Sequence, residues 1–246
     1  MRILVVDDDK KMTNLLKKII EPTGYICDVA HSGQDALDMI LQCKMSKGKA
    51  YMYDLLLTDK YLGDIDGVEL MVTLRLKSVS IPVIFISCLS SIDNRVRALE
   101  FGADDFLCKN DLHKSELVSR VRAVLRRSYR HTFSRFTIGT MEIDFHMQVC
   151  KIKGKTVSLT NKEYSMLELL CLHGPGAIVS KEKFISHLYS NNEPSEPKII
   201  DVFACKLRSK IAKVNNGRSY IETVWGRGYT LNENAQPIRS DKVGTI

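Results

Sequence analysis

Chemically reactive side chains follow four short apolar runs of this 246-residue chain, each at the point where its run ends. Two aspartates come directly after residues 2–6, a third follows 55–58, a serine closes 83–87 and a lysine follows 105–108: Asp7, Asp8, Asp59, Ser87 and Lys109. Short, nearly continuous apolar runs are typical of parallel strands covered on both faces of a sheet. Because the carboxyl ends of such strands meet at one edge, we expect these side chains to lie together.

Together these groups could support phosphoryl transfer. Clustered carboxylates repel one another, and Mg²⁺ relieves that repulsion by binding one or two carboxylates together with water and phosphate oxygens. The Lys109 ammonium could neutralise a phosphoryl oxygen, and the Ser87 hydroxyl could donate a hydrogen bond to another. Asp59 could then act as a nucleophile toward an in-line phosphoryl donor and form an acyl phosphate.

The same residues have other possible roles. Acids such as Asp7, Asp8 and Asp9 also favour a helix N-terminus, and Ser87 and Lys109 taken singly are ordinary surface or capping residues. An enzymatic alternative is a magnesium-dependent phosphatase of the haloacid-dehalogenase type, which requires a DxDxT motif on the first strand. The DDDKK segment lacks that threonine, and a phosphatase would leave the basic second half of the chain unexplained. We therefore expect no enzyme.

Apolar runs and amphipathic segments alternate through the first half of the chain. They predict strands at 2–6, 26–30, 55–58, 83–87 and 105–108, and helices at about 10–21, 34–45, 67–77, 92–101 and 114–127. This alternation implies an α/β fold, a doubly wound, five-stranded parallel sheet of the flavodoxin-like kind, over residues 1–127. Residues 44–52 are polar and are assigned no function.

A different pattern begins after residues 128–135, which carry no periodicity and are predicted to be a linker. Residues 136–159 alternate between apolar and polar side chains and contain turn signals, which indicates small antiparallel strands. The segment from Thr160 to Glu163 is a capping box that opens a helix.

Two more helices and a hairpin complete this half. Ser180 and Pro197 begin the helices, the second of which runs to about Val214, and residues 220–231 indicate the hairpin. Small strands, three helices and a hairpin predict a winged helix-turn-helix domain over 136–232. The polar residues 233–246 are predicted to be a disordered tail.

Charge is unevenly distributed between the halves. The net charge of +7 divides into 19 Lys+Arg against 18 Asp+Glu in residues 1–128, and 17 against 11 in residues 129–246. A basic half suggests a polyanionic partner, most commonly nucleic acid, although solubility alone could also account for it.

Cysteine use and hydropathy favour a cytoplasmic protein. The 7 cysteines are scattered and form no CxxC pair, as expected for free thiols in a reducing compartment, and a zinc site is not expected. The chain has no run of apolar residues long enough for a membrane span, and its N-terminus resembles a buried strand rather than a signal peptide.

The predicted helix at 198–214 has a core face and a basic outer face. At 100° per residue the core face carries Ile200, Phe203, Ala204, Leu207, Ile211 and Val214. The opposite face and its flanks carry the candidate DNA contacts: Lys198, Asp201, Val202, Cys205, Lys206 and Arg208. Cations there could meet phosphates or guanine, Asp201 a cytosine amine and Val202 a thymine methyl. The alternative is a solvated basic face.

The hairpin offers two more candidate contacts, Thr223 and Arg227. Arg227 stands between two glycines at a turn, where the backbone can approach DNA closely and the guanidinium could enter a narrow minor groove. We expect Trp225 and Tyr229 to pack on the helices rather than on bases.

Residues 1–127 resemble the receiver domain of response regulators, on the stretches ILVVDDD, DLLLTDKYLGDIDGVEL, PVIFIS and GADDFLCK. The resemblance implies that Asp59 is the phosphoacceptor, that Asp7 and Asp8 bind Mg²⁺ with a backbone carbonyl of Tyr61, and that Lys109 contacts phosphate. It also implies that Ser87 and Phe106 form the switch pair, and that the donor is a phosphohistidine on a kinase or phosphotransferase.

Residues 136–231 resemble the OmpR/PhoB winged-helix family, on LTNKEYSMLELL, IIDVFACKLRSKI and IETVWGRGYTL, and within it the cell-cycle regulators of alphaproteobacteria. The resemblance implies dimeric binding to A/T-rich promoter half-sites and a contact with RNA polymerase. It also implies a symmetric receiver dimer in which charges pair between subunits: Arg95 with Glu116, Glu100 with Arg122, and Asp105 with Arg120.

Two positions depart from the family pattern. Gly63 stands where the family commonly has proline, and Lys109 is followed by Asn110, Asp111 and Leu112 in place of the usual Pro-Phe. A cis bond without proline costs about 3–4 kcal/mol, so we expect a trans bond with a remodelled loop, or else a strained exception. This departure supports an alternative in which the receiver dimerises without phosphorylation.

Overall fold

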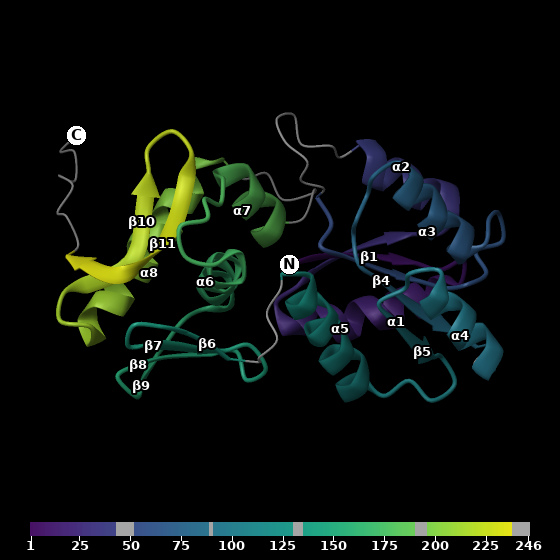
Figure 1. The fold of residues 1–246 in the computed structure, drawn as a ribbon, viewed down its shortest axis with the longest axis horizontal. Coiled ribbons are helices and arrows are strands. Elements are labelled where there is room, and N and C mark those ends of the chain that lie inside the picture. The colour runs from purple at the N-terminus through teal and green to yellow at the C-terminus, as the bar shows by residue number, and fades with distance from the viewer. Residues whose placement is uncertain (43–51, 89–90, 130–134, 190–195, 238–246) are drawn as a thin grey trace. The chain divides into compact units, whose positions relative to one another are not determined.

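The computed structural model describes residues 1–42, 52–88, 91–129, 135–189 and 196–237. Contacts group the chain into two compact units, one formed mainly by residues up to 130 and the other beginning at His131. Both are drawn in Figure 1, and each is considered by itself. Among the described residues, no helix is long and apolar enough to cross a membrane.

The first unit is a parallel five-stranded sheet with strand order β2-β1-β3-β4-β5. Its strands are β1 (Arg2–Val6), β2 (Ile26–Ala30), β3 (Leu55–Thr58), β4 (Val83–Ser87) and β5 (Asp105–Cys108). Its helices are α1 (Lys10–Ile20), α2 (Gly33–Gln42), α3 (Gly67–Leu76), α4 (Ile92–Glu100) and α5 (Lys114–Ser128), with a short 3₁₀ turn at Glu21–Thr23. The flavodoxin-like fold expected from the alternating pattern is confirmed.

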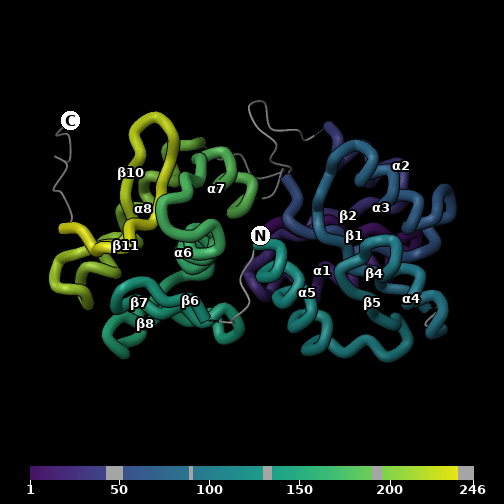
Figure 2. The backbone as a smooth tube through the Cα atoms, in the orientation of Figure 1, coloured from purple at the N-terminus to yellow at the C-terminus, as the bar shows by residue number. Residues whose placement is uncertain are grey.

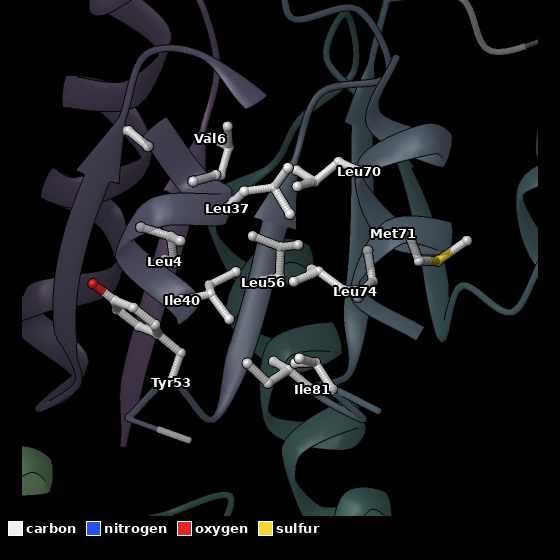
Figure 3. Close-up of a cluster of buried hydrophobic side chains, with 14 of the residues drawn as sticks. Leu4, Val6, Leu37, Ile40, Tyr53, Leu56, Leu70, Met71, Leu74 and Ile81 are labelled. Carbon is white, nitrogen blue, oxygen red and sulfur yellow. The ribbon is translucent and has the colours of Figure 1, made fainter. Parts of the chain in front are cut away.

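The core of this unit lies on both faces of the sheet. β1, β3 and β4 are fully buried, which explains their continuous apolar sequences. Helices α2 and α3 lie on one face, while α1 and α5 lie on the other (Figure 1). Figure 3 shows Leu37 and Ile40 of α2 and Leu70 and Leu74 of α3 gathered around Leu56 of β3. This packing holds the strand ends, and the side chains that follow them, in place.

The second unit begins with an antiparallel sheet in the order β6-β7-β8-β9: β6 (Arg135–Ile138), β7 (Met141–Asp144), β8 (Val149–Ile152) and β9 (Lys155–Val157). The helices α6 (Asn161–His173), α7 (Lys181–Leu188) and α8 (Lys198–Val214) follow, and then the hairpin of β10 (Arg218–Val224) and β11 (Gly228–Pro237). The predicted winged helix-turn-helix arrangement is confirmed. The capping box opens α6 as expected, with Thr160 and Glu163 bonded to each other's backbone N–H.

One sequence-based expectation for this unit is wrong. The tail was expected to start at residue 233, but β11 continues to Pro237 because Gln236 and Pro237 are the register partners of Ser219 and Arg218 in β10. An irregularity between Ser219 and Ile221 separates this part of the ladder from the rest of the hairpin. Residues 238–246, the middle of the predicted linker (130–134) and most of the polar segment 44–52 lie outside the described residues.

Gly67 is the residue on which the turn from β3 into α3 depends. It follows the cap residue Asp66, whose side chain accepts a hydrogen bond from Val68 N–H at 2.7 Å. A Cβ at Gly67 would lie 2.2 Å from the backbone oxygen of Asp59 and 3.0 Å from the ring of Phe85. Glycine therefore allows α3 to start directly against the segment that carries Asp59.

We predict that Gly67→Ala destabilises the first unit by about 3 kcal/mol, because the added methyl group overlaps backbone atoms. Hydrogen exchange of the β3 and β4 amides in the full chain should accelerate by roughly a hundredfold. Gly33→Ala is the comparison at the first residue of α2, where a Cβ would lie 2.2 and 2.6 Å from atoms of the Ile65 side chain. Because a side chain can shift more readily than backbone, Gly33→Ala should cost less. Equal effects of the two substitutions would contradict this account.

Candidate functional site: an acidic cluster and a nucleic-acid face

The strand ends of the first unit converge as their sequence positions predicted. The β-ladder continues one residue past the strands, since Asp59 N–H donates to Val6 O at 2.9 Å and Lys109 N–H donates to Ser87 O at 3.0 Å. Asp7 and Ser87 are buried, and Asp59 is nearly so. The sheet itself therefore sets the spacing of these groups.

The Lys109 ammonium joins two of the carboxylates. Its Nζ lies 2.5 Å from Asp59 Oδ2 and 2.7 Å from Asp7 Oδ2. Burial alone would lower the pKa of Lys109, but the hydrogen bonds to Asp59 and Asp7 outweigh it and raise this pKa. Burial raises the pKa of Asp7, against the opposing effect of Lys109. Additional positive charge would therefore stabilise Asp7 in its ionised form.

Asp7, Asp8 and Asp59 form the acidic cluster, in which one oxygen from each carboxylate lies within 4.8 Å of the others. Asp8 is exposed, so one side of the cluster is open to solvent. Carboxylate oxygens that meet at an accessible edge suit a hard cation such as Mg²⁺. Asp9 does not join them, because its side chain caps α1 by accepting a hydrogen bond from Lys11 N–H at 2.8 Å.

Two backbone N–H groups hold the loop after Asp59 in place. Lys60 N–H donates to Asp59 Oδ1 at 2.5 Å, and Gly67 N–H donates to Lys60 O at 2.6 Å. Tyr61, half exposed, forms an isolated β-bridge with Asp66. Gly63 has a φ of +80°, which proline cannot adopt, so the departure from the family pattern at this position reflects a different local backbone.

Two residues of this loop contact other helices, and the sequence analysis identified neither contact. Asp64 accepts hydrogen bonds from Gly33 N–H and Gln34 N–H, both at 2.9 Å, at the start of α2. Lys60 Nζ donates to Asn94 Oδ1 of α4 at 2.7 Å. The segment that carries Asp59 is thus tied to one helix on each side. Ser32 already supplies the local capping signal for α2, so no sequence feature indicated Asp64.

The peptide bond after Lys109 and the position of Phe106 are also defined in the structure. All described peptide bonds are trans, including the bond from Lys109 to Asn110. Phe106 is buried, and its Cα is paired in register with that of Phe85 across β4 and β5.

The expected dimer charges lie on α4, β5 and α5. Arg95 and Glu100 are exposed, while Arg122 is half-buried on α5. Within the single chain, Arg120 bonds Asp105 at 3.0 Å and Glu116 at 2.7 Å.

Helix α8 presents the two faces predicted from its periodicity. Ile200, Ala204, Leu207 and Ile211 are buried, and Phe203 and Val214 are half-buried. The opposite face is exposed along its length, including Val202, of which 50% is accessible: Lys198, Val202, Cys205, Lys206, Ser209 and Lys213.

The flanks of α8 are engaged with neighbouring elements. Asp201 accepts hydrogen bonds from Lys181 Nζ of α7, at 2.8 Å, and from the Tyr229 hydroxyl of β11. Arg208 donates to Ile221 O at 3.0 Å and to Thr223 Oγ1 at 2.8 Å. Contact of Asp201 with a cytosine would require these bonds to rearrange. Their immediate effect is to join α8 to the hairpin.

The tip of the hairpin differs from the expectation for one aromatic residue. Tyr229 packs on the helices as expected, with its ring edge-on to Phe184 at 6.1 Å between centroids. Trp225, however, is 82% exposed, at the turn between β10 and β11. Arg227, two residues later, is also exposed.

Comparison with known proteins finds a matching family for each half of the chain. Residues 3–122 match the family described as response regulator receiver domain, and residues 154–231 match transcriptional regulatory protein, C terminal. The cell cycle response regulators CtrA of Brucella anthropi and Brucella ovis are each 40% identical over 233 residues, covering 95% of this chain and 96% of theirs.

Among solved structures, the response regulator DrrB of Thermotoga maritima, an OmpR/PhoB homologue, is 27% identical. The match covers 94% of this chain and 98% of DrrB, with a TM-score of 0.41. With a receiver matched in its first half, an effector matched in its second and relatives aligned over nearly its whole length, this chain belongs to the OmpR/PhoB family of two-component response regulators.

Proposed function

We propose that this chain is a transcription regulator whose DNA binding is switched by phosphorylation of Asp59. The observation that carries the proposal is the placement of Asp59 Oδ2 against the Lys109 ammonium, inside a cluster of three carboxylates that can hold Mg²⁺. The phosphoryl donor would be a phosphohistidine of a partner histidine kinase or phosphotransferase.

The reaction needs little beyond positioning and charge. An Asp59 carboxylate oxygen attacks phosphorus as the bond from phosphorus to the donor imidazole nitrogen breaks, and the imidazole keeps the electron pair. Lys109 can move from the Asp59 carboxylate to a phosphoryl oxygen, and Ser87 can donate to another. Mg²⁺ held by Asp7, Asp8, Asp59 and the Tyr61 carbonyl would offset the charge of the incoming phosphoryl group.

Phosphorylation would change DNA binding by promoting dimerisation of the receiver. Reorientation of Ser87 and Phe106 would favour association through α4, β5 and α5, and two effector units would then bind adjacent A/T-rich half-sites and contact RNA polymerase. Helix α8 would read the major groove with Lys198, Val202, Cys205, Lys206 and Arg208, beside Asp201, while Thr223 and Arg227 contact DNA from the hairpin. Because the relatives are named for the cell cycle, we extend the proposal to cytoplasmic, cell-cycle transcription control.

A second candidate is a receiver that dimerises without phosphorylation. It is favoured by the loop after Lys109, which lacks the proline of the family pattern, and by Lys109 already being paired with two carboxylates. The two candidates differ in whether loss of the Asp59 carboxylate changes DNA binding.

For the metal site, we predict that Asp8→Asn weakens Mg²⁺ binding roughly tenfold or more, because an exposed carboxylate ligand becomes a neutral amide. Isothermal titration calorimetry of the full chain measures this. Asp38→Asn makes the same charge change on the exposed part of α2, outside the cluster, and should leave the affinity unaltered. Equal losses in both variants would argue for a general effect of charge.

For the phosphoacceptor, acetyl phosphate should add one phosphoryl group to the wild-type chain and none to Asp59→Ala, as read by intact-protein mass spectrometry. Acetyl phosphate or beryllofluoride should also raise the DNA affinity of the wild type by roughly five- to a hundredfold, the usual range of coupling between two sites. If both proteins bind DNA equally under every condition, the phosphorylation-independent candidate is correct.

For the dimer, Arg120→Glu should weaken phosphorylation-dependent association roughly tenfold in sedimentation equilibrium, because each exposed pair contributes about 0–1 kcal/mol and symmetry doubles it. Arg95→Glu should act in the same direction without breaking the internal pairs of Arg120. Lys18→Glu, on α1, is the control for the change in charge. Association that survives both arginine variants would rule out this interface.

A further inference from the structure

Among the described residues of the second unit, Trp225 is the most exposed large apolar side chain, and it is the only tryptophan of the chain. Tryptophan is on average highly buried in folded proteins, so an indole with 82% of its surface accessible is unusual. The DNA contacts proposed above do not include Trp225.

The turn holds this side chain at the end of the hairpin. Arg227 N–H donates to Val224 O at 2.9 Å and closes a β-turn in which Trp225 is the second residue and Gly226 the third. Gly226 has a φ of +72°, the conformation for which such a turn requires glycine at that position. Figure 2 shows this turn on the side of the unit away from the β6–β9 sheet.

The part of the hairpin next to this turn is fixed to the segment before α7 and to α8. Val179 and Tyr229 exchange two backbone hydrogen bonds, of 2.8 and 3.0 Å. A Cβ on Gly228 would lie 2.0 Å from Val179 O, so only glycine allows this close approach. The Tyr229–Asp201 and Arg208–Thr223 bonds then tie both strands to α8. The position of Trp225 relative to the exposed face of α8 is therefore set before any ligand binds.

A hollow between α8 and the hairpin places the indole beside cations. This cavity, of about 600 Å³, is lined by α8 and α7 residues together with the hairpin turn, among them Lys181, Asp201, Cys205, Arg208, Trp225 and Arg227. Asp201 is paired with Lys181. The other charged groups in the lining are Arg208, Arg227 and Glu182, which leaves a net charge of +1. This small excess of positive charge at the turn favours a polyanion over an apolar protein surface.

We propose that Trp225 is a DNA-contacting residue whose indole packs against the deoxyribose wall of the minor groove that Arg227 enters. The inference rests on the proposed DNA-binding function and specifies a further contact within it. Deoxyribose offers an apolar surface next to the phosphates, so an indole can cover it while Arg227 reaches the groove. The contact requires no base to leave the stack, and it adds no charge to the interface.

The first test uses the single tryptophan as the reporter. The full chain, with and without beryllofluoride, is titrated with a fluorescently labelled A/T-rich duplex of about 30 base pairs, long enough for two half-sites one helical turn apart. Anisotropy of the label measures binding, and tryptophan emission with acrylamide quenching measures the exposure of Trp225 in the same samples. We expect quenching by acrylamide to fall at least threefold as the duplex saturates.

The second test separates the indole from the charge. Trp225→Ala should weaken binding about tenfold and leave the slope of log affinity against log salt unchanged. Arg227→Ala should instead reduce that slope by about 1.8, because the two chains on the duplex each lose one cation and each cation contributes about 0.9. Trp225→Phe keeps a ring and should lose less than about threefold. Because Trp225 is exposed, neither of its variants should unfold, which circular dichroism verifies.

Each other outcome has a definite meaning. Saturable binding with unchanged acrylamide quenching, and with Trp225→Ala within twofold of the wild type, overturns this inference and leaves DNA binding intact. An altered salt slope in Trp225→Ala also overturns it, since the residue would then act through charged neighbours. If no duplex binds under any condition, the proposed function itself fails and this inference fails with it.

Discussion

A single ammonium group between two carboxylates holds the acidic site of the first unit together. Lys109 follows β5, whereas Asp7 and Asp59 follow β1 and β3 nearer the middle of the sheet, so its side chain reaches across the end of β4 to meet them. Burial makes the negative charge of Asp7 costly, and Lys109 offsets part of that cost. A phosphoryl group on Asp59 would compete for the same ammonium, so the contact that stabilises the resting site is also one that phosphorylation would change.

In the second unit, hydrogen bonds likewise hold neighbouring elements of the candidate site together. Asp201 and Arg208 have types that could read bases, yet both are hydrogen-bonded to the hairpin or to α7. If α8 and the hairpin bind DNA as proposed, joined in this way they would meet it as one rigid surface, and less conformational entropy would be lost on binding. The loop after Asp59 is tied in a similar way, through Asp64 to α2 and through Lys60 to α4.

The sequence predicts the features that depend on a regular spacing of apolar residues or on a position at the end of a helix or strand. The strands of the first unit, the buried face of α8 and the strand-end cluster follow from spacing alone, because the carboxyl ends of parallel strands share an edge. Side-chain contacts between distant segments outside this edge of the sheet were not predictable. Asp64 caps a helix 31 residues away, and Asp201 pairs with Tyr229 in another element. The exposure of Trp225 could not be predicted, because the hydrophobicity of a residue does not reveal whether any helix or strand covers the turn that carries it.

The extent of β11 has a practical consequence for preparing the effector half as a separate fragment. The segment that matches the regulatory family, 154–231, excludes β6, β7 and β8, and it ends within β11. A polypeptide cut at those limits would keep β9 without its partner β8, and it would remove the residues that pair with Arg218 and Ser219. Unpaired strand edges promote self-association, so a well-behaved fragment should start before Arg135 and extend beyond Pro237.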